Sequence, residues 1–152
     1  EDAMTLTMLD KPAEYKETKP WPAEIAAEFE RESRNPNPCV GTELLSENER
    51  TRVWIIRLAP GERVGFHRHV LDYFWTAVNG GRARQYVNDG SMIEMSYLPG
   101  ETRHETYGKG EYKVHDLANI GDHDMIFMTV EFKDSANAPM PLPAGVKPGM
   151  AA

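Results

Sequence analysis

Residues 61–69 read Gly-Glu-Arg-Val-Gly-Phe-His-Arg-His, and this segment decides the fold that we expect. It predicts a β-strand over Arg63–His69, with His67 and His69 two positions apart. Because side chains alternate along a strand, both imidazoles are expected on one face. Two neutral imidazoles on one face favour a transition-metal site, and two unrelated histidines are the alternative interpretation.

Similar short segments precede and follow this strand, and Gly-, Pro- and Asn-containing turns separate them. Short strands at intervals of roughly ten residues are typical of an antiparallel sandwich or barrel. We therefore predict an all-β domain over residues 39–133. The expected strands are Cys39–Ser46, Arg52–Leu58, Arg63–His69, Asp72–Val78, Arg82–Val87, Met92–Tyr97, Thr102–Tyr107, Tyr112–Leu117 and Met125–Phe132.

The two flanking segments differ from this central part in composition. Residues 1–38 form a polar N-terminal arm, in which Trp21–Arg31 predicts a short helix because Pro22 suits a first helical turn. Residues 134–152 contain four prolines together with Ala and Gly. They predict an irregular tail that lies over the barrel or over a partner chain.

Composition excludes several classes of protein. The 152 residues predict one domain, and the net charge of −7 argues against a general nucleic-acid binder. The single Cys excludes an internal disulfide framework, and no apolar run approaches the roughly 20 residues of a membrane helix. We expect neither nucleic acid nor a membrane as partner, and a cytoplasmic location by default. The chain begins at Glu1 rather than Met, so processing could have removed a preceding segment.

Two groups of residues resemble the paired sequence motifs of the cupin superfamily. They are Gly61-x5-His67-x-His69 with Gly80, and Pro99-Gly100 with His115-x3-Asn119. The resemblance covers roughly residues 52–132 and implies a double-stranded β-barrel, or jelly roll, with a metal near one end of its interior. It does not name a reaction, because this fold hosts many functions.

Carried over position by position, the resemblance implies that His67, His69 and His115 are the metal ligands. Most cupins add a Glu four or five positions after the second His, and this chain has Tyr73 at the first of those positions. By strand parity Tyr73 points inward, whereas Asp72 would ligate only if a bulge re-aimed it. We therefore expect a three-His site in which Tyr73 is a weak ligand, a hydrogen-bonding neighbour or a barrel-filling aromatic.

A metal held by three neutral imidazoles keeps its full charge and open positions for water, O2 or an anionic substrate. Fe(II) is favoured for oxygen chemistry, as in three-His cupin dioxygenases, and Zn, Ni, Mn and Cu are alternatives. Two residues are catalytic candidates. Tyr73 could act as an acid or base if a metal lowers its pKa. His104 shares strand parity with Thr102 and Thr106 and would face the cavity, unless it is a surface histidine.

Three functions are compatible with these residues. The first is a metal-dependent enzyme that carries out an oxygenase-type reaction on a small organic molecule, with carboxylates among the candidate substrates. The second is a lyase or isomerase in which the metal is a Lewis acid and Tyr73 the base. The third is a non-catalytic cupin that binds a metal or a small ligand.

Two further expectations concern relatives and assembly. Residues 66–73 and 119–124 are similar to those of small bacterial monocupins that are commonly linked to β-alanine catabolism. We also expect a homodimer in which Cys39–Ser46 pairs across chains, since exposed edge strands need covering.

Overall fold

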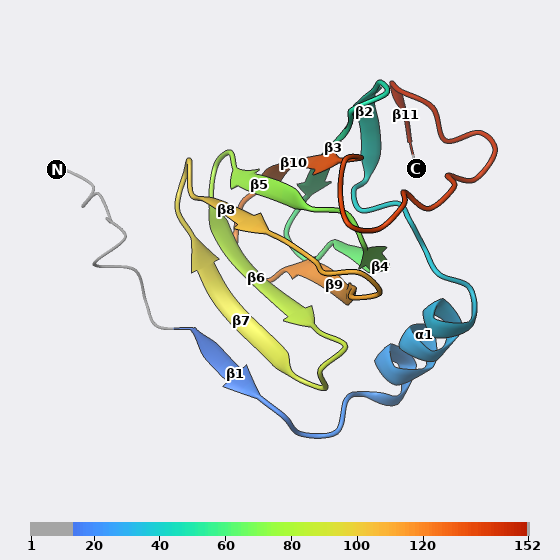
Figure 1. The fold of residues 1–152 in the computed structure, drawn as a ribbon. Coiled ribbons are helices and arrows are strands. Elements are labelled where there is room, and N and C mark those ends of the chain that lie inside the picture. Colours follow the sequence, from blue (N-terminus) through green and yellow to red (C-terminus); the bar gives the residue numbers. More distant parts are fainter. Residues whose placement is uncertain (1–13, 152) are drawn as a thin grey trace, which may run out of the picture.

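The computed structural model describes residues 14–151. Within this range the chain folds into one helix and two antiparallel β-sheets that enclose a barrel (Figure 1). The elements are β1 (Tyr15–Glu17), α1 (Ala23–Arg34), β2 (Glu43–Glu47), β3 (Thr51–Leu58), β4 (Arg63–His69), β5 (Tyr73–Ala77), β6 (Gly81–Tyr86), β7 (Met92–Tyr97), β8 (Thr102–Glu105), β9 (Lys113–Asn119), β10 (Met125–Phe132) and β11 (Met150–Ala151).

The strand order of the two sheets is β1-β7-β6-β9-β4 and β11-β2-β3-β10-β5-β8. Neighbouring strands in this order are mostly far apart in the sequence, as a jelly roll requires. The expectation of an all-β jelly roll with one short helix is therefore confirmed. In the described part of the chain, no helix is both long and apolar enough to span a membrane.

All nine predicted strands are present, most with small differences at their ends, but the strand predicted over Cys39–Ser46 begins only at Glu43. The strand predicted over Thr102–Tyr107 ends at Glu105, and the amide of Tyr107 instead donates to Asp72 Oδ1 at 2.9 Å. The helix starts after Pro22 and extends to Arg34. Basic side chains in its last turn and an Arg34–Glu30 ion pair at 3.1 Å favour this longer end.

The inward faces of the two sheets meet in an apolar core. The strand β10 shows the alternation most clearly, because every second residue from Met125 to Glu131 is buried. The rings of Trp75, Tyr97 and Phe127 meet edge to face, with centroids 5.0–5.6 Å apart. The buried members of this core are Ile56, Leu58, Ala77, Ala83, Met95, Tyr97, Leu117, Met125 and Phe127.

The flanking arms add a short strand to each sheet, which the sequence analysis did not predict. β1 pairs with β7, and β11 pairs with β2 at Glu43 and Leu44. Between β10 and β11 the tail is irregular, as expected, and Leu142 and Val146 pack against a second apolar cluster that includes Trp54. The outer side of β2 is therefore paired with the chain's own tail at Glu43 and Leu44.

Candidate metal centre

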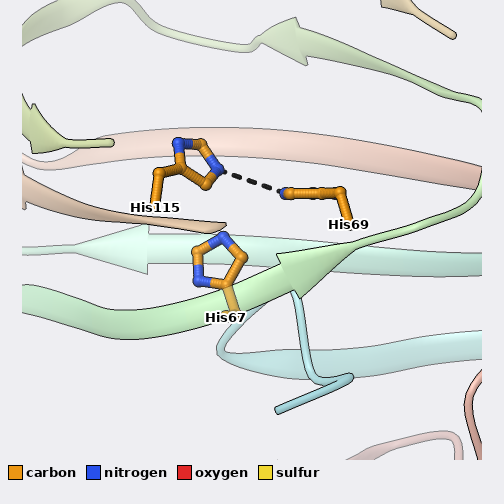
Figure 2. A group of neighbouring side chains, drawn as sticks. All are labelled: His67, His69 and His115. Atoms are coloured by element: carbon orange, nitrogen blue, oxygen red, sulfur yellow. Dashed lines mark hydrogen bonds between the residues drawn. The ribbon is translucent and has the colours of Figure 1, made fainter. Parts of the chain in front are cut away.

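Three histidines meet inside the barrel, from two neighbouring strands (Figure 2). His67 and His69 lie on β4, and His115 lies on β9 directly across from His67. His67 and His69 are almost fully buried, with 1% and 2% of their surface exposed. The nitrogen atoms that the three imidazoles offer all lie within 4.8 Å of one another.

Hydrogen bonds orient two of these rings. His67 Nδ1 lies 2.8 Å from the carbonyl oxygen of Gly65, and His115 Nδ1 lies 2.6 Å from Gln85 Oε1. Both partners are acceptors, so each Nδ1 carries the proton and each Nε2 offers a lone pair. The Nε2 atoms of His69 and His115 are 3.1 Å apart.

This arrangement fits a transition-metal ion. Two nitrogens bound to one ion at about 2.1 Å, at angles of about 90–110°, lie about 2.9–3.4 Å apart, and the observed 3.1 Å falls in this range. His67 Nε2 is buried and has no hydrogen-bond partner among the described residues, which is costly unless something else binds it. A shared ion would satisfy all three Nε2 atoms at once.

The imidazoles are held in the neutral form that a metal requires. Burial lowers the pKa of His67 to about 4, and it lowers the pKa values of His69 and His115 well below the usual range. The charge of Lys113 lowers all three pKa values further. No proton therefore has to be displaced from these rings near neutral pH.

Tyr73 occupies the position at which most cupins carry the carboxylate ligand, and it faces inward as parity predicted. Its ring is buried and stacks on His69, with centroids 4.1 Å apart and 12° between the planes. Burial raises the pKa of Tyr73 well above its usual value, and the neighbouring Tyr107 is the next largest cause. The phenol is therefore a hydrogen-bond donor near neutral pH.

Asp72 points away from the histidines. Its carboxylate accepts the backbone N–H of Tyr107 at 2.9 Å, and its own N–H donates to Ser135 Oγ. No bulge re-aims it, because the register from Tyr73 along β5 is regular. Asp72 is therefore oriented as strand parity predicted, and it is not among the residues that cluster with the histidines.

His104 does not face the cavity, so its role as a catalytic candidate is corrected in favour of the alternative, a surface histidine. Its side chain is exposed, and its ring lies 5.4 Å from that of Phe74 on the outer face of the sheet. β8 pairs with β5 so that Tyr73 is opposite Glu105. This register turns Arg103 and Glu105 inward, and both line the cavity.

A cavity of about 150 Å³ opens from the histidines. In other proteins a cavity of about this volume accepts a molecule the size of benzene. One part of its wall is apolar and includes Ile56, Trp75, Ile93, Met95, Leu117 and Phe127. The polar part includes Gln85, Arg103, Glu105 and Lys113, and it was not predicted from the sequence. Lys113 was detectable, because it stands two residues before His115 and so shares its face of the strand.

A buried carboxyl group lies beside this cavity and was also missed. Glu131 is 3% exposed, lies opposite Tyr73 on β10, and accepts a hydrogen bond from Trp54 Nε1 at 2.8 Å. Burial raises its pKa to about 7, although the hydrogen bond from Trp54 and the charge of Arg52 both lower it. The alternation of β10 was the signal for its inward orientation.

Several solved structures resemble this fold. A cupin domain from Bordetella pertussis Tohama I aligns with a TM-score of 0.54 at 26% identity, covering 64% of this chain and 96% of its own. A protein with a double-stranded β-helix domain from Klebsiella pneumoniae aligns at 0.49 and 22% identity, covering 65% and 79%. An RmlC-like cupin family protein from Methanocaldococcus jannaschii aligns at 0.49 and 18%, covering 60% and 77%. No family model and no curated protein matches the sequence.

The jelly-roll fold and the alignment with the B. pertussis domain define the class of protein. This chain belongs to the cupin superfamily. Within that class it has three clustered histidines that could bind a metal and a tyrosine in place of the usual carboxylate. The closer likeness to the monocupins linked to β-alanine catabolism stays a prediction.

Proposed function

We propose that this cupin is a metal-dependent enzyme that carries out an oxygenase-type reaction on a small organic molecule, with Fe(II) as the favoured metal. The observation that carries the proposal is the cluster of three neutral imidazoles, two of them almost fully buried, in the wall of a small cavity. With no carboxylate among the ligands, an ion there keeps its full charge. When bound, iron supplies one-electron chemistry with O2 and Lewis acidity.

The chain's own residues have distinct roles in this proposal. His67, His69 and His115 hold the ion, and Gly65 and Gln85 orient two of the rings. The phenol of Tyr73, stacked on His69, donates a hydrogen bond to the substrate. The apolar wall of the cavity limits the access of water and accepts the rest of the molecule.

A lyase or isomerase that uses Tyr73 as its base is the less favoured alternative. A base must lose its proton near neutral pH, and burial raises the pKa of Tyr73 in the metal-free protein, so this alternative requires a bound metal to lower that pKa. A non-catalytic cupin that binds a metal or a small ligand would use the same histidines but would form no product.

Substrate-dependent oxygen uptake tests the proposal. The Fe(II)-loaded protein is screened against small organic molecules, carboxylates included, in an oxygen electrode and in parallel under anaerobic conditions. We expect uptake with at least one compound, and we expect its loss in His67→Ala but not in His123→Ala, because His123 is exposed in a turn. Anaerobic turnover would instead favour the lyase or isomerase, and ligand binding with no product in either screen would favour the non-catalytic alternative.

A further inference from the structure

Lys113 brings an ammonium group to the histidine cluster without an ion-pair partner among the described residues. It lies on β9 directly across from His69 on β4, and two residues before His115. Lys113, His115 and Leu117 share the inward face of β9, and all three line the cavity. The register of the two strands therefore places Lys113 within the same pair of strands that carries all three histidines.

This placement is electrostatically unfavourable for a metal site unless an anion is also bound. The charged residues that line the cavity are Glu14, Arg103, Glu105 and Lys113, and their charges cancel. A divalent ion on three neutral imidazoles therefore adds two positive charges that the protein does not balance. Like charges repel strongly in a partly buried site, so an anion that contacts both the ion and the ammonium is favoured.

We propose that the cavity binds a small carboxylic acid whose carboxylate lies between the three-His centre and the ammonium of Lys113. This inference rests on the proposed metal site and names its ligand class. A carboxylate suits the position because it has two oxygens, one for each positive group. A second cation, Arg103, lies at the cavity too, but it is half exposed and 3.4 Å from Glu101 Oε2, so it is the weaker partner.

The rest of the ligand is defined by the apolar part of the cavity wall. Trp75, Ile93, Met95 and Phe127 present apolar surface to the cavity and offer no charged group. The cavity volume of about 150 Å³ suits a body of roughly six carbon atoms. The expected ligand is therefore a monocarboxylate with a short aliphatic or aromatic body.

Calorimetric titration of the zinc-loaded protein with benzoate and with benzamide tests this inference. The two probes have nearly the same shape, and only benzoate is charged. We expect benzoate to bind at least tenfold more tightly than benzamide. We expect Lys113→Gln to lower the affinity for benzoate by roughly 10- to 100-fold, as for the loss of a hydrogen bond between charged groups. Lys109→Gln is the matched control, because it removes the same charge from an exposed turn.

The zinc content of each variant separates the two proposals. If zinc binds but benzoate and benzamide bind equally well, or Lys113→Gln binds benzoate as the wild type does, the carboxylate inference is wrong and the metal site stands. If the wild type binds no transition metal, both proposals fail. If Lys113→Gln does not fold, Lys113→Arg is used instead and should retain benzoate binding. The comparison of benzoate with benzamide in the wild type then still shows whether the cavity prefers a carboxylate.

Discussion

The side chain of Gln85 holds one of the three imidazoles in place. Its Oε1 accepts the Nδ1–H of His115 at 2.6 Å, and its amide also hydrogen-bonds to the side chain of Tyr97. Partners of this kind orient the ring and raise the basicity of the nitrogen that binds the metal.

Removing this acceptor is expected to weaken metal binding without unfolding the barrel. We expect Gln85→Met to lower zinc affinity by about 10- to 100-fold. Gln85→Glu keeps an acceptor oxygen and is expected to stay close to the wild type. Competition with a chromophoric chelator measures both, and a Gln85→Met protein with unchanged affinity would show that His115 needs no such support.

Glu131 makes the stability of the protein depend on pH. Its pKa is about 7 in the folded protein and lies near 4.5 in an unfolded chain, so folding favours its protonated form. The stabilising effect of the bound proton is complete below about pH 4.5 and is lost as the pH rises through 7. The buried histidines act in the opposite direction, because their pKa values are lowered.

Comparison with Glu131→Gln isolates this effect, since Gln keeps the acceptor for Trp54 Nε1 and does not titrate. We expect the variant to gain stability relative to the wild type between about pH 5 and pH 8, by about 2 kcal/mol. Urea unfolding of the metal-free proteins at both pH values measures the difference. An equal effect of the substitution at the two pH values would mean that Glu131 is already ionised in the fold.

Among the elements, the helix α1 supports the strand that carries two of the histidines. β4 contains a bulge between Val64 and His67, which disturbs its pairing with β9. Glu28 of α1 accepts the N–H of Phe66 inside this bulge at 2.8 Å, and it also forms an ion pair with Arg63 at 2.7 Å. Gly65, whose carbonyl orients His67, lies so close that an added Cβ would be 2.8 Å from Glu28 Oε2.

We therefore expect Glu28→Ala and Gly65→Ala both to disturb the position of His67. Glu28→Ala removes the acceptor for Phe66 N–H, and Gly65→Ala adds a Cβ beside Glu28. Each should change the absorption spectrum of the cobalt-loaded protein and lower its metal affinity, because the ring of His67 loses its fixed position. Glu30→Ala is the matched control on the same helix, since Glu30 is exposed and pairs with Arg34. Unchanged spectra in both variants would mean that the helix only covers the sheet.

At the scale of the elements, the sequence predicted well the strands that show a local alternation of apolar and polar residues. The strands Arg63–His69, Met92–Tyr97 and Met125–Phe132 have the predicted bounds, because their apolar faces and flanking turns are local signals. The short strands β1 and β11 were not predicted, because partners far along the chain determine them. The prediction for His104 was wrong for a related reason, because only the pairing of β8 with β5 determines which face of β8 points inward.

At the scale of the molecule, the histidine cluster could be predicted and much of its surroundings could not. The motif spacing indicated His67, His69 and His115, and the fold brings them together. Gln85 and Glu105 lie on β6 and β8, and nothing in their local sequence relates them to the histidines. Their part in the cavity depends on how the two sheets close, which strand parity does not describe.

Assembly of two copies is a further expectation at this scale. β8 and β4 end their sheets, and edge strands with unpaired backbone groups need covering. We expect a homodimer in which such edges pair across chains; Cys39–Ser46 stays a candidate contact, although β11 already pairs with its residues Glu43 and Leu44. Light scattering at micromolar concentration should give twice the chain mass of 17.2 kDa, and the mass of a single chain would contradict the expectation.

Elemental analysis of the purified protein shows whether the three histidines hold a metal. We predict about one equivalent of a transition metal in the wild type and in the exposed-histidine variant His104→Ala/His123→Ala. The variant His67→Ala/His69→Ala should lose the metal while its circular dichroism spectrum stays that of a β-barrel. A wild-type protein that carries no metal, and that also fails to take up added iron, zinc, nickel, manganese or copper, would contradict the account.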